Sequence, residues 1–306
     1  MTGRSRLLLL AQTKRSSESF AAAFADDAKQ AGFKLVPGRY DDPKALKEAR
    51  KRNCRAAMAI ISDIDSPEHI PVLPKLKALG VTAMNSFKAL CVTHDKIQTH
   101  HCLVKHSIPT PRTTIATQQS EIKHQLAQLD CPYPIIVKGS HGATGHDVYL
   151  CETSDDAISI AQQMKAVDQT RTITGRTVHM AGVLFQEYLP QGNTSLRIIV
   201  CEGEVIAAAK HIARNGEFRS NVANGAKSVP VTLPANVVDL CIRTAAALGQ
   251  GFAGIDLAPD PSSPAGYSVL ESECAPGHQI SKTSGVNIRA RHLEALAARV
   301  KAKQLV

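Results

Sequence analysis

Short apolar runs alternate with amphipathic helical patterns up to about residue 85. The apolar runs lie at 7–11, 34–36 and 56–61, and the helical patterns between them lie at 17–31 and 43–52. Alternation of this kind is typical of βαβ units, in which helices join parallel strands and cover the sheet. The pattern therefore predicts a small parallel α/β unit at the start of the chain.

After residue 85 the pattern changes to a helical stretch followed by strands. The helical stretch 85–106 ends at 107–111, because the prolines there cannot continue a helix. Strand patterns follow at 134–138, 148–151, 184–189, 196–200 and 205–209. The glycines of 139–145 lie between the first two of these strands. They predict a hairpin loop whose backbone can approach a ligand closely.

Two helices and a second hairpin are predicted in the last third of the chain. Residues 234–248 form an amphipathic pattern with proline near its start and Gly249 after its end, as helix capping prefers. Residues 287–306 carry apolar side chains at helical spacing, which indicates packing and not chemistry. Between these helices, the apolar segments around Asp256 and Glu271 are joined by a turn rich in Pro, Gly and Ser, which predicts a hairpin.

Three acidic residues lie on this predicted hairpin. Glu271 and Glu273 are two residues apart on one strand and face the same side, because strand side chains alternate with a period of two. Asp256 on the partner strand can join them, and hard oxygen ligands of this kind suit Mg²⁺. The acids could instead form the solvated face of a strand, but their apolar neighbours indicate a core sheet, where uncompensated carboxylates are costly. The pattern therefore favours a metal site.

Length and cysteine content limit the class of protein. A chain of 306 residues can form two or three compact units with a sizeable core. Its eight cysteines are scattered without a Cys-x-x-Cys pair, so neither a zinc knuckle nor a disulfide framework is indicated. The apolar run near the N-terminus is too short for a secretory signal, and no run approaches the roughly 20 residues that span a bilayer. We therefore expect a cytoplasmic protein with no membrane partner.

The net charge of +9 narrows the choice of partners. Basic proteins bind nucleic acids, anionic membranes or small anions. Here lysine and arginine are spread along the chain, aromatic residues make up 4% of it and tryptophan is absent, so platforms for base stacking are scarce. We expect no nucleic-acid partner, and phosphates or acidic metabolites explain the charge better.

Ten short motifs occur along the chain, and their order identifies a protein family more specifically than any single motif does. They are 85–90, 95–96, 108–111, 136–138, 142–145, 186–189, Arg197, 216–221, 254–256 and 271–277. With these motifs in this order, the chain resembles the ATP-grasp superfamily and, within it, the RimK-like carboxylate–amine ligases. The resemblance covers about residues 85 to 285, whereas the residues before them fit only a generic small α/β domain.

The resemblance implies an α/β (α+β) ATP-grasp fold with three subdomains. A small parallel α/β N-terminal domain would occupy residues 1–88. A central lobe with the glycine loop would occupy residues 89–188, and a C-terminal lobe with the metal site would occupy residues 189–306. ATP would be held between these two α+β lobes.

The reaction of similar enzymes joins an acid to an amine with the use of ATP. ATP phosphorylates a carboxylate, and an amine attacks the acyl phosphate, so that ADP and phosphate are released. The resemblance thus implies ATP and Mg²⁺ as cofactors, with Mn²⁺ as a substitute ion. The expected product is an amide between an acidic small molecule or peptide and an amino acid. A homo-oligomer would also fit the family.

The resemblance assigns a set of residues to the nucleotide. Lys96 and Lys138 match the lysines that meet the phosphates, each as a point charge, although Lys96 alone would be interpreted as a solvated helix lysine. The loop that closes over the phosphates is matched by Ser140, Gly142, Thr144 and Gly145. The linker that contacts the adenine edge through its backbone is matched by Gln186, Glu187, Tyr188 and Leu189.

The segment Gly-Glu-Phe-Arg-Ser-Asn at 216–221 matches a part of the family that lies beside the transferred phosphate and the substrate carboxylate. Its Arg219 can bind an oxyanion through two parallel hydrogen bonds. Together with Asn221 and Lys138, it forms the expected catalytic set. Arg197 would add a further positive group or would form a buried ion pair with a carboxylate. The residues that match the metal ligands are Asp256, Glu271 and Glu273.

Three positions depart from the family pattern. Glu273 stands where relatives usually carry asparagine, and Ser195 stands where they often carry an aspartate. His211, with Lys210 beside it, stands where an arginine is common. His211 could serve a phosphate or could be an ordinary hairpin histidine. We count Ser195, Lys210 and His211 among the expected cofactor contacts, but these departures weaken any inference about the substrate.

Two other functions would use the same residues. A kinase would transfer phosphate to a stable acceptor, and a regulatory module would bind the nucleotide without turnover. Ser195, Glu273 and His211 motivate the second alternative, whereas the intact phosphate and metal residues argue against it. No motif identifies the substrates, although the N-terminal unit and the loops near 170–180 and 276–288 are expected to shape their site.

Overall fold

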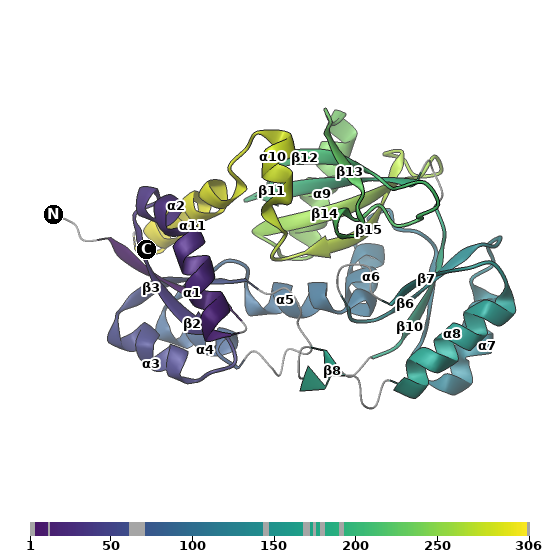
Figure 1. The fold of residues 1–306 in the computed structure, drawn as a ribbon, viewed down its shortest axis with the longest axis horizontal. Helices are drawn as coiled ribbons and strands as arrows, with labels where there is room; N and C mark the ends of the chain where they lie inside the picture. Colours follow the sequence, from purple (N-terminus) through teal and green to yellow (C-terminus); the bar gives the residue numbers. More distant parts are fainter. Residues whose placement is uncertain are drawn as a thin grey trace.

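The structure is a computed structural model that describes residues 4–11, 13–60, 71–142, 147–167, 172–173, 176–177, 181–189 and 193–304. Within these residues the strands form a four-stranded parallel sheet, a four-stranded and a five-stranded antiparallel sheet, and a two-stranded antiparallel ribbon (Figure 1). The helices flank the sheets. The predicted mixed α/β (α+β) class is therefore confirmed.

The first sheet is parallel and has the order β2-β1-β3-β4. Its strands are β1 (Ser5–Ala11), β2 (Phe33–Arg39), β3 (Cys54–Ala59) and β4 (Thr82–Ala83). Its helices are α1 (Lys14–Ala23), α2 (Ala25–Gln30), α3 (Lys44–Lys51) and α4 (Leu73–Leu76). The leucines of β1 are fully buried, because a central parallel strand is covered on both faces. The predicted parallel unit is confirmed, except that its first helix starts earlier and is interrupted at Phe24.

The helical stretch predicted at 85–106 contains two helices, α5 (Phe87–His94) and α6 (Lys96–Lys105). Between them Asp95 has an extended backbone. Its carboxylate accepts hydrogen bonds from the backbone N–H groups of Ile97 (2.9 Å) and Gln98 (3.3 Å), so it caps a new helix. The predicted helical stretch is confirmed, with a break at Asp95. The break makes Lys96 the first residue of α6.

The second sheet is antiparallel and has the order β5-β10-β6-β7. Its strands are β5 (Thr113–Ala116), β6 (Ile135–Gly139), β7 (Val148–Cys151) and β10 (Val183–Glu187). Helices α7 (Ile122–Gln128) and α8 (Ser154–Val167) share a core with these strands. The ribbon joins β8 (Thr172–Ile173) to β9 (Arg176–Thr177). The pairing of β6 with β7 around the glycine loop confirms the predicted hairpin.

The third sheet is antiparallel and has the order β13-β12-β11-β14-β15. Its strands are β11 (Thr194–Cys201), β12 (Glu204–Ile212), β13 (Lys227–Pro230), β14 (Phe252–Pro259) and β15 (Tyr267–Glu273). Helix α9 (Ala235–Ala247) covers one face, where Leu240 and Val237 pack with Ile198, Ile255 and Leu257. The opposite face of β11, β14 and β15 carries charged side chains.

The last helix, α11 (Ile288–Gln304), connects the third sheet to the first and follows the short α10 (Ser281–Ser284). It contacts α2, β3 and β4 as well as β11 and β12, and Figure 1 shows it beside α2. Its Leu293 and Leu296 share one core with Leu7 and Phe252. This helix packs as predicted. Among the residues described, none of the helices combines the length and apolarity that crossing a bilayer requires.

Candidate active site

The acidic hairpin forms as the sequence predicts. Strands β14 and β15 pair antiparallel, with Asp256 opposite Glu271 and Gly254 opposite Glu273. Residues that pair across neighbouring strands lie on the same face, so the three carboxylates share one face of the sheet. On the next strand, β11, Arg197 pairs with Asp256. A guanidinium therefore lies on the same face as the three acids.

Arg197 binds two of these carboxylates. Its Nε and Nη2 donate to the two oxygens of Asp256 at 2.6 and 2.8 Å, and its Nη1 donates to Glu273. Burial by itself lowers the pKa of Arg197, but the two carboxylates outweigh it and raise the pKa above the usual value. Of the two roles left open for Arg197, the buried ion pair is the one observed.

Glu271 lies apart from this ion pair. Its carboxylate is 3.8 Å from the Nζ of Lys96, and its side chain is 40% exposed. The described part of the chain contains no cluster of three or more histidine, cysteine, aspartate or glutamate side chains that could hold a metal. Asp256 still has one lone pair on each oxygen beyond those bound to Arg197. Asp256 and Glu271 thus have the chemistry for Mg²⁺, which needs only one or two carboxylates.

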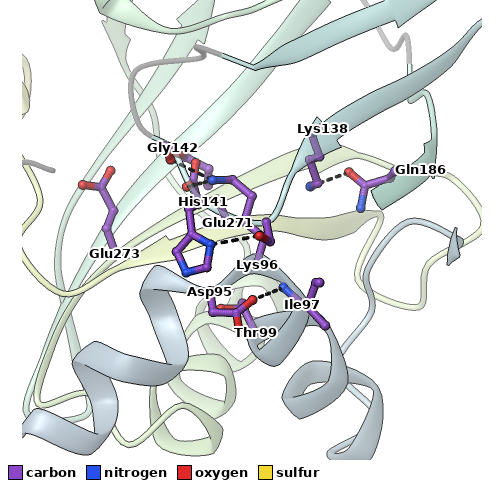
Figure 2. Close-up of polar contacts among 12 residues, drawn as sticks. Asp95, Lys96, Ile97, Thr99, Lys138, His141, Gly142, Gln186, Glu271 and Glu273 are labelled. Atoms are coloured by element: carbon purple, nitrogen blue, oxygen red, sulfur yellow. Dashed lines mark hydrogen bonds and ion pairs between the residues drawn. The ribbon is translucent and has the colours of Figure 1, made fainter. Parts of the chain in front are cut away.

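The two predicted phosphate lysines meet at one place. Lys96 donates from Nζ to the carbonyl of Gly142 at 2.8 Å, and Lys138 donates from the end of β6 to the side-chain oxygen of Gln186 at 2.9 Å (Figure 2). Lys138 is buried. Burial, with the nearby charge of Lys96, lowers the pKa of Lys138 to about 8. Two ammonium groups therefore lie beside Glu271 and give this place in the structure positive charge.

A small cavity lies between these groups. Its volume is about 20 Å³, which is enough for one water molecule. The residues that line it come from α5, α6, β6, β10, β15 and the loop before β5, and they include Lys96, His100, Lys138, Gln186 and Glu271. The structure therefore brings together predicted residues that are far apart in the sequence.

The start of the glycine loop is hydrogen-bonded to neighbouring segments of the chain through Ser140. Ser140 is fully buried, and its hydroxyl accepts from the backbone N–H of Gly182 at 3.3 Å and lies 2.9 Å from the Nδ1 of His141. The Ser140 carbonyl accepts from the backbone N–H of Lys96 at 2.8 Å. The loop is thus tied to the start of α6. The predicted contacts Thr144 and Gly145 lie outside the described residues.

The predicted linker to adenine runs out of β10. The amide nitrogen of Gln186 donates to the hydroxyl of Thr113 at 2.8 Å, so both ends of this amide are bound. The carboxylate of Glu187 accepts hydrogen bonds from the Nε (3.2 Å) and the Nη2 (3.3 Å) of Arg112. Tyr188 and Leu189 follow and are half-buried, and the hydroxyl of Tyr188 donates to Asn193 at 2.9 Å. These side chains hold the linker in place.

The predicted catalytic arginine is held by an acid of its own segment. Arg219 donates from Nε and Nη2 to the two oxygens of Glu217, both at 3.0 Å, and its guanidinium lies 5.4 Å from the ring centre of Phe218. Phe218 in turn packs edge-on against Tyr188, at the end of the linker. Asn221 opens the short turn that follows. The two parallel donors of the Arg219 guanidinium, its Nε and Nη2, are therefore bound to the carboxylate of Glu217.

Ser195, Lys210 and His211 do not share one face. Ser195 pairs with His211 on the face of Arg197, whereas Lys210 pairs with Leu196 on the face covered by α9. The structure therefore does not bring Lys210 to the site. Ser195 accepts from the hydroxyl of Ser220 at 2.6 Å. His211 is buried, its Nε2 has no hydrogen-bond partner among the described residues, and burial lowers its pKa.

Two residues have structural roles that were not predicted, although Asn85 belongs to the motif 85–90. Asn85 accepts at its side-chain oxygen from the backbone N–H groups of Gly251 and Phe252, and it donates to the carbonyls of Phe252 and Cys274. It thereby ties the start of β14 to the end of β15. His100 lines the cavity, and its buried Nδ1 has no hydrogen-bond partner within the part of the chain that the structure describes. Neither role is visible in the sequence, because each depends on distant segments.

Comparison with known proteins identifies the family. The sequence model of the RimK-like ATP-grasp domain matches residues 93–296. The chain belongs to this family. A protein of Haemophilus influenzae named "Probable alpha-L-glutamate ligase" is 31% identical over 225 residues, which cover 73% of this chain and 69% of the relative. A protein of Legionella pneumophila with the same name is 28% identical over 232 residues, covering 75% and 72%.

Solved structures confirm the ATP-grasp fold. D-alanine–D-alanine ligase from Bacillus anthracis superposes with a TM-score of 0.71 at 16% identity, over 98% of this chain and 99% of that one. The RimK domain ATP-grasp protein of Sphaerobacter thermophilus superposes with a TM-score of 0.67 at 18% identity, over 95% and 99%. These likenesses extend over nearly the whole chain. The family and the fold that the motif order implied are therefore confirmed.

Proposed function

We propose that this protein is an ATP- and Mg²⁺-dependent carboxylate–amine ligase. It would form an amide between an acidic small molecule or peptide and an amino acid, through an acyl phosphate, with release of ADP and phosphate. The observation that carries the proposal is the meeting of Lys96, Lys138 and Glu271 at one cavity. They come from three separate elements, and together they offer positive charge for phosphates beside a carboxylate for Mg²⁺.

The residues suit phosphoryl transfer because that chemistry depends on positioning and electrostatic stabilisation. Lys96 and Lys138 would neutralise phosphate oxygens, and the tie of Lys96 to Gly142 would place the glycine loop over them. Asp256 and Glu271 would hold the Mg²⁺, whose charge offsets that of the phosphates when it is bound. A phosphate close to Lys138 would favour its protonated form, against the effect of burial.

Arg219 is suited to the acid substrate. A guanidinium with two parallel donors fits a carboxylate or an acyl phosphate oxyanion. In the structure Glu217 occupies these donors. An incoming carboxylate would compete with Glu217 for the same fork. This arrangement supports the proposal that one substrate is an acid.

The names of the relatives suggest the first substrates to test. Two of them are named for alpha-L-glutamate, and we therefore propose L-glutamate as the first amine. A panel of acids, from dicarboxylates to peptides with acidic C-termini, would be combined with it. Release of ADP and phosphate that requires both an acid and the amine would support the ligase. Release of AMP, or no nucleotide turnover with any pair, would contradict it.

Trapping with hydroxylamine separates the ligase from a kinase. A hydroxamate formed from the acid and ATP without the amine would indicate an acyl phosphate. A phosphorylated product that is stable to hydroxylamine would indicate a kinase instead. The variant Asp256→Asn serves as the control in both assays. If ATP turnover were unchanged in this variant, a purely regulatory nucleotide site would be favoured.

A further inference from the structure

The three carboxylates of the hairpin are not equivalent. Asp256 and Glu273 are hydrogen-bonded to Arg197, whereas the ion pair of Glu271 within the described residues is a 3.8 Å contact with Lys96. Figure 2 shows Glu271 among Lys96 and Gly142, with Glu273 apart from that group. From the strand pattern alone, Glu271 and Glu273 would have the same role, because both side chains face the same side of β15. The contacts give them different partners.

The backbone leaves room for Arg197 to reach Glu273. Gly254 is the residue of β14 that pairs with Glu273. A Cβ atom on Gly254 would lie 3.1 Å from the Nη1 of Arg197 and 2.5 Å from the Cβ of Pro276. The second distance is shorter than real Cβ atoms show, so a side chain at this position would displace its neighbours. Glycine thus keeps open the space that the guanidinium and Pro276 share.

The charges around Arg197 indicate that its guanidinium is a constant partner of the neighbouring carboxylates. Asp256 and Glu273 face the positive side chain of Arg197, whereas Glu271 lies beside those of Lys96 and Lys138. Both Arg197 and Asp256 are about five-sixths buried as side chains, with 16% and 15% exposure. Removing one partner of such a pair leaves a poorly compensated charge. Arg197 is therefore needed by Asp256 and Glu273 whether or not a metal ion is bound.

We propose that Arg197 is the permanent cation of this face, that Glu273 is its counter-ion and not a metal ligand, and that a divalent ion is held by Asp256 and Glu271. The inference rests on the proposed function, since it assumes that the site binds a divalent ion. It goes beyond that function by dividing the acidic residues into two roles. Glu273 is then a positioning residue, which acts through Arg197 on the orientation of Asp256.

Two matched variants test the division. Glu271→Gln and Glu273→Gln make the same change two residues apart on the same face of β15. The probe is Mn²⁺, titrated into the full chain with ADP and followed by the paramagnetic resonance signal of the free ion. Glu271→Gln should weaken Mn²⁺ binding by roughly tenfold or more, since even indirect partners of metal sites are worth about 10- to 100-fold. Glu273→Gln should leave the affinity within about threefold.

Thermal unfolding without metal provides the second readout. Arg197→Met should lower Tm, because Asp256 and Glu273 then lose their shared partner. Adding Glu273→Gln to Arg197→Met should restore part of the lost Tm, whereas adding Glu271→Gln should restore less. A rescue of this kind reports the coupling between Arg197 and Glu273 directly. A protein in which Glu273 served only as a metal ligand would not show it.

The outcomes distinguish this inference from the proposed function. If the unmodified protein binds no Mn²⁺ in the presence of ADP, the proposed function fails, and this inference fails with it. If Mn²⁺ binds and Glu273→Gln weakens it as strongly as Glu271→Gln does, Glu273 is a metal ligand and only the inference is overturned. If Glu273→Gln fails to rescue Arg197→Met better than Glu271→Gln does, its role as counter-ion is overturned.

Discussion

Lys138 at the end of β6 donates to Gln186 on β10 at 2.9 Å, within a buried site where the lysine pKa falls to about 8. The two residues pair neighbouring strands, and Gln186 passes the contact on to Thr113 of β5. This chain of bonds fixes the ammonium at the wall of the cavity. Its charge at the site is therefore set by burial as well as by pH.

ATP binding should weaken as pH rises past 8. Because the pKa of Lys138 is lowered to about 8, its ammonium is charged below that pH and becomes neutral above it. Phosphate binding needs the charged form, so the Kd for ATP should rise by up to about tenfold between pH 7 and pH 9. Calorimetric titrations across this range check the effect. In Lys138→Arg, whose guanidinium stays charged, the Kd should stay nearly constant, and an equal slope in both proteins would contradict this account.

Lys96 should contribute to nucleotide affinity more than its position on a helix suggests. Its Nζ holds the carbonyl of Gly142 and lies near Glu271. Lys96→Ala should weaken ATP binding by about 2 kcal/mol, or roughly thirtyfold, as expected for loss of a charged hydrogen-bond donor. Lys105 is exposed at the other end of the same helix. Lys105→Ala is therefore the matched control, and a similar loss in both variants would argue for a nonspecific charge effect.

Asn85 should be important for stability. Its side chain makes four hydrogen bonds to the backbone near the two ends of the β14–β15 hairpin. Asn85→Ala leaves these buried groups without partners and should reduce the free energy of unfolding by at least about 3 kcal/mol. Denaturant unfolding measures the change. Asn236 is exposed and has one long contact of 3.5 Å, so Asn236→Ala should change stability by less than about 0.5 kcal/mol.

Arg219 should act through its planar fork and not only through its charge. Arg219→Lys keeps the charge but removes the two parallel donors that now bind Glu217. Once an acid and amine pair is found, this variant should lower kcat/KM by about 100-fold, in the range seen when a donor to a developing anion is lost. Arg214 is exposed and donates to a backbone carbonyl. Arg214→Lys should retain nearly full activity. If both variants lost activity to a similar extent, the two parallel donors of Arg219 would not be the cause.

Much of the fold is determined by local pattern in the sequence. The apolar runs at 7–11 and 56–61 became β1 and β3, and the acidic segments became the β14–β15 hairpin. A period of two was sufficient to place Glu271 and Glu273 on one face. Lys138, at the end of an apolar strand beside a glycine loop, lies at the cavity. These features depend on residues close together in the chain, so the sequence reveals them.

The partners of the charged residues were decided only by tertiary structure. Arg197 reaches Asp256 and Glu273 because β11 pairs with β14 in one particular register, and a shift of one residue would have moved its side chain to the face of α9. The pairing of β12 with β11 placed His211 on the face of Arg197 and Lys210 on the face of α9. Local periodicity says which residues share a face of one strand, but it does not say which strand will lie beside it. Hence the sequence determined that three acids would gather on the hairpin, and the packing of distant strands decided that Glu273 would be bound by an arginine and Glu271 would face a lysine.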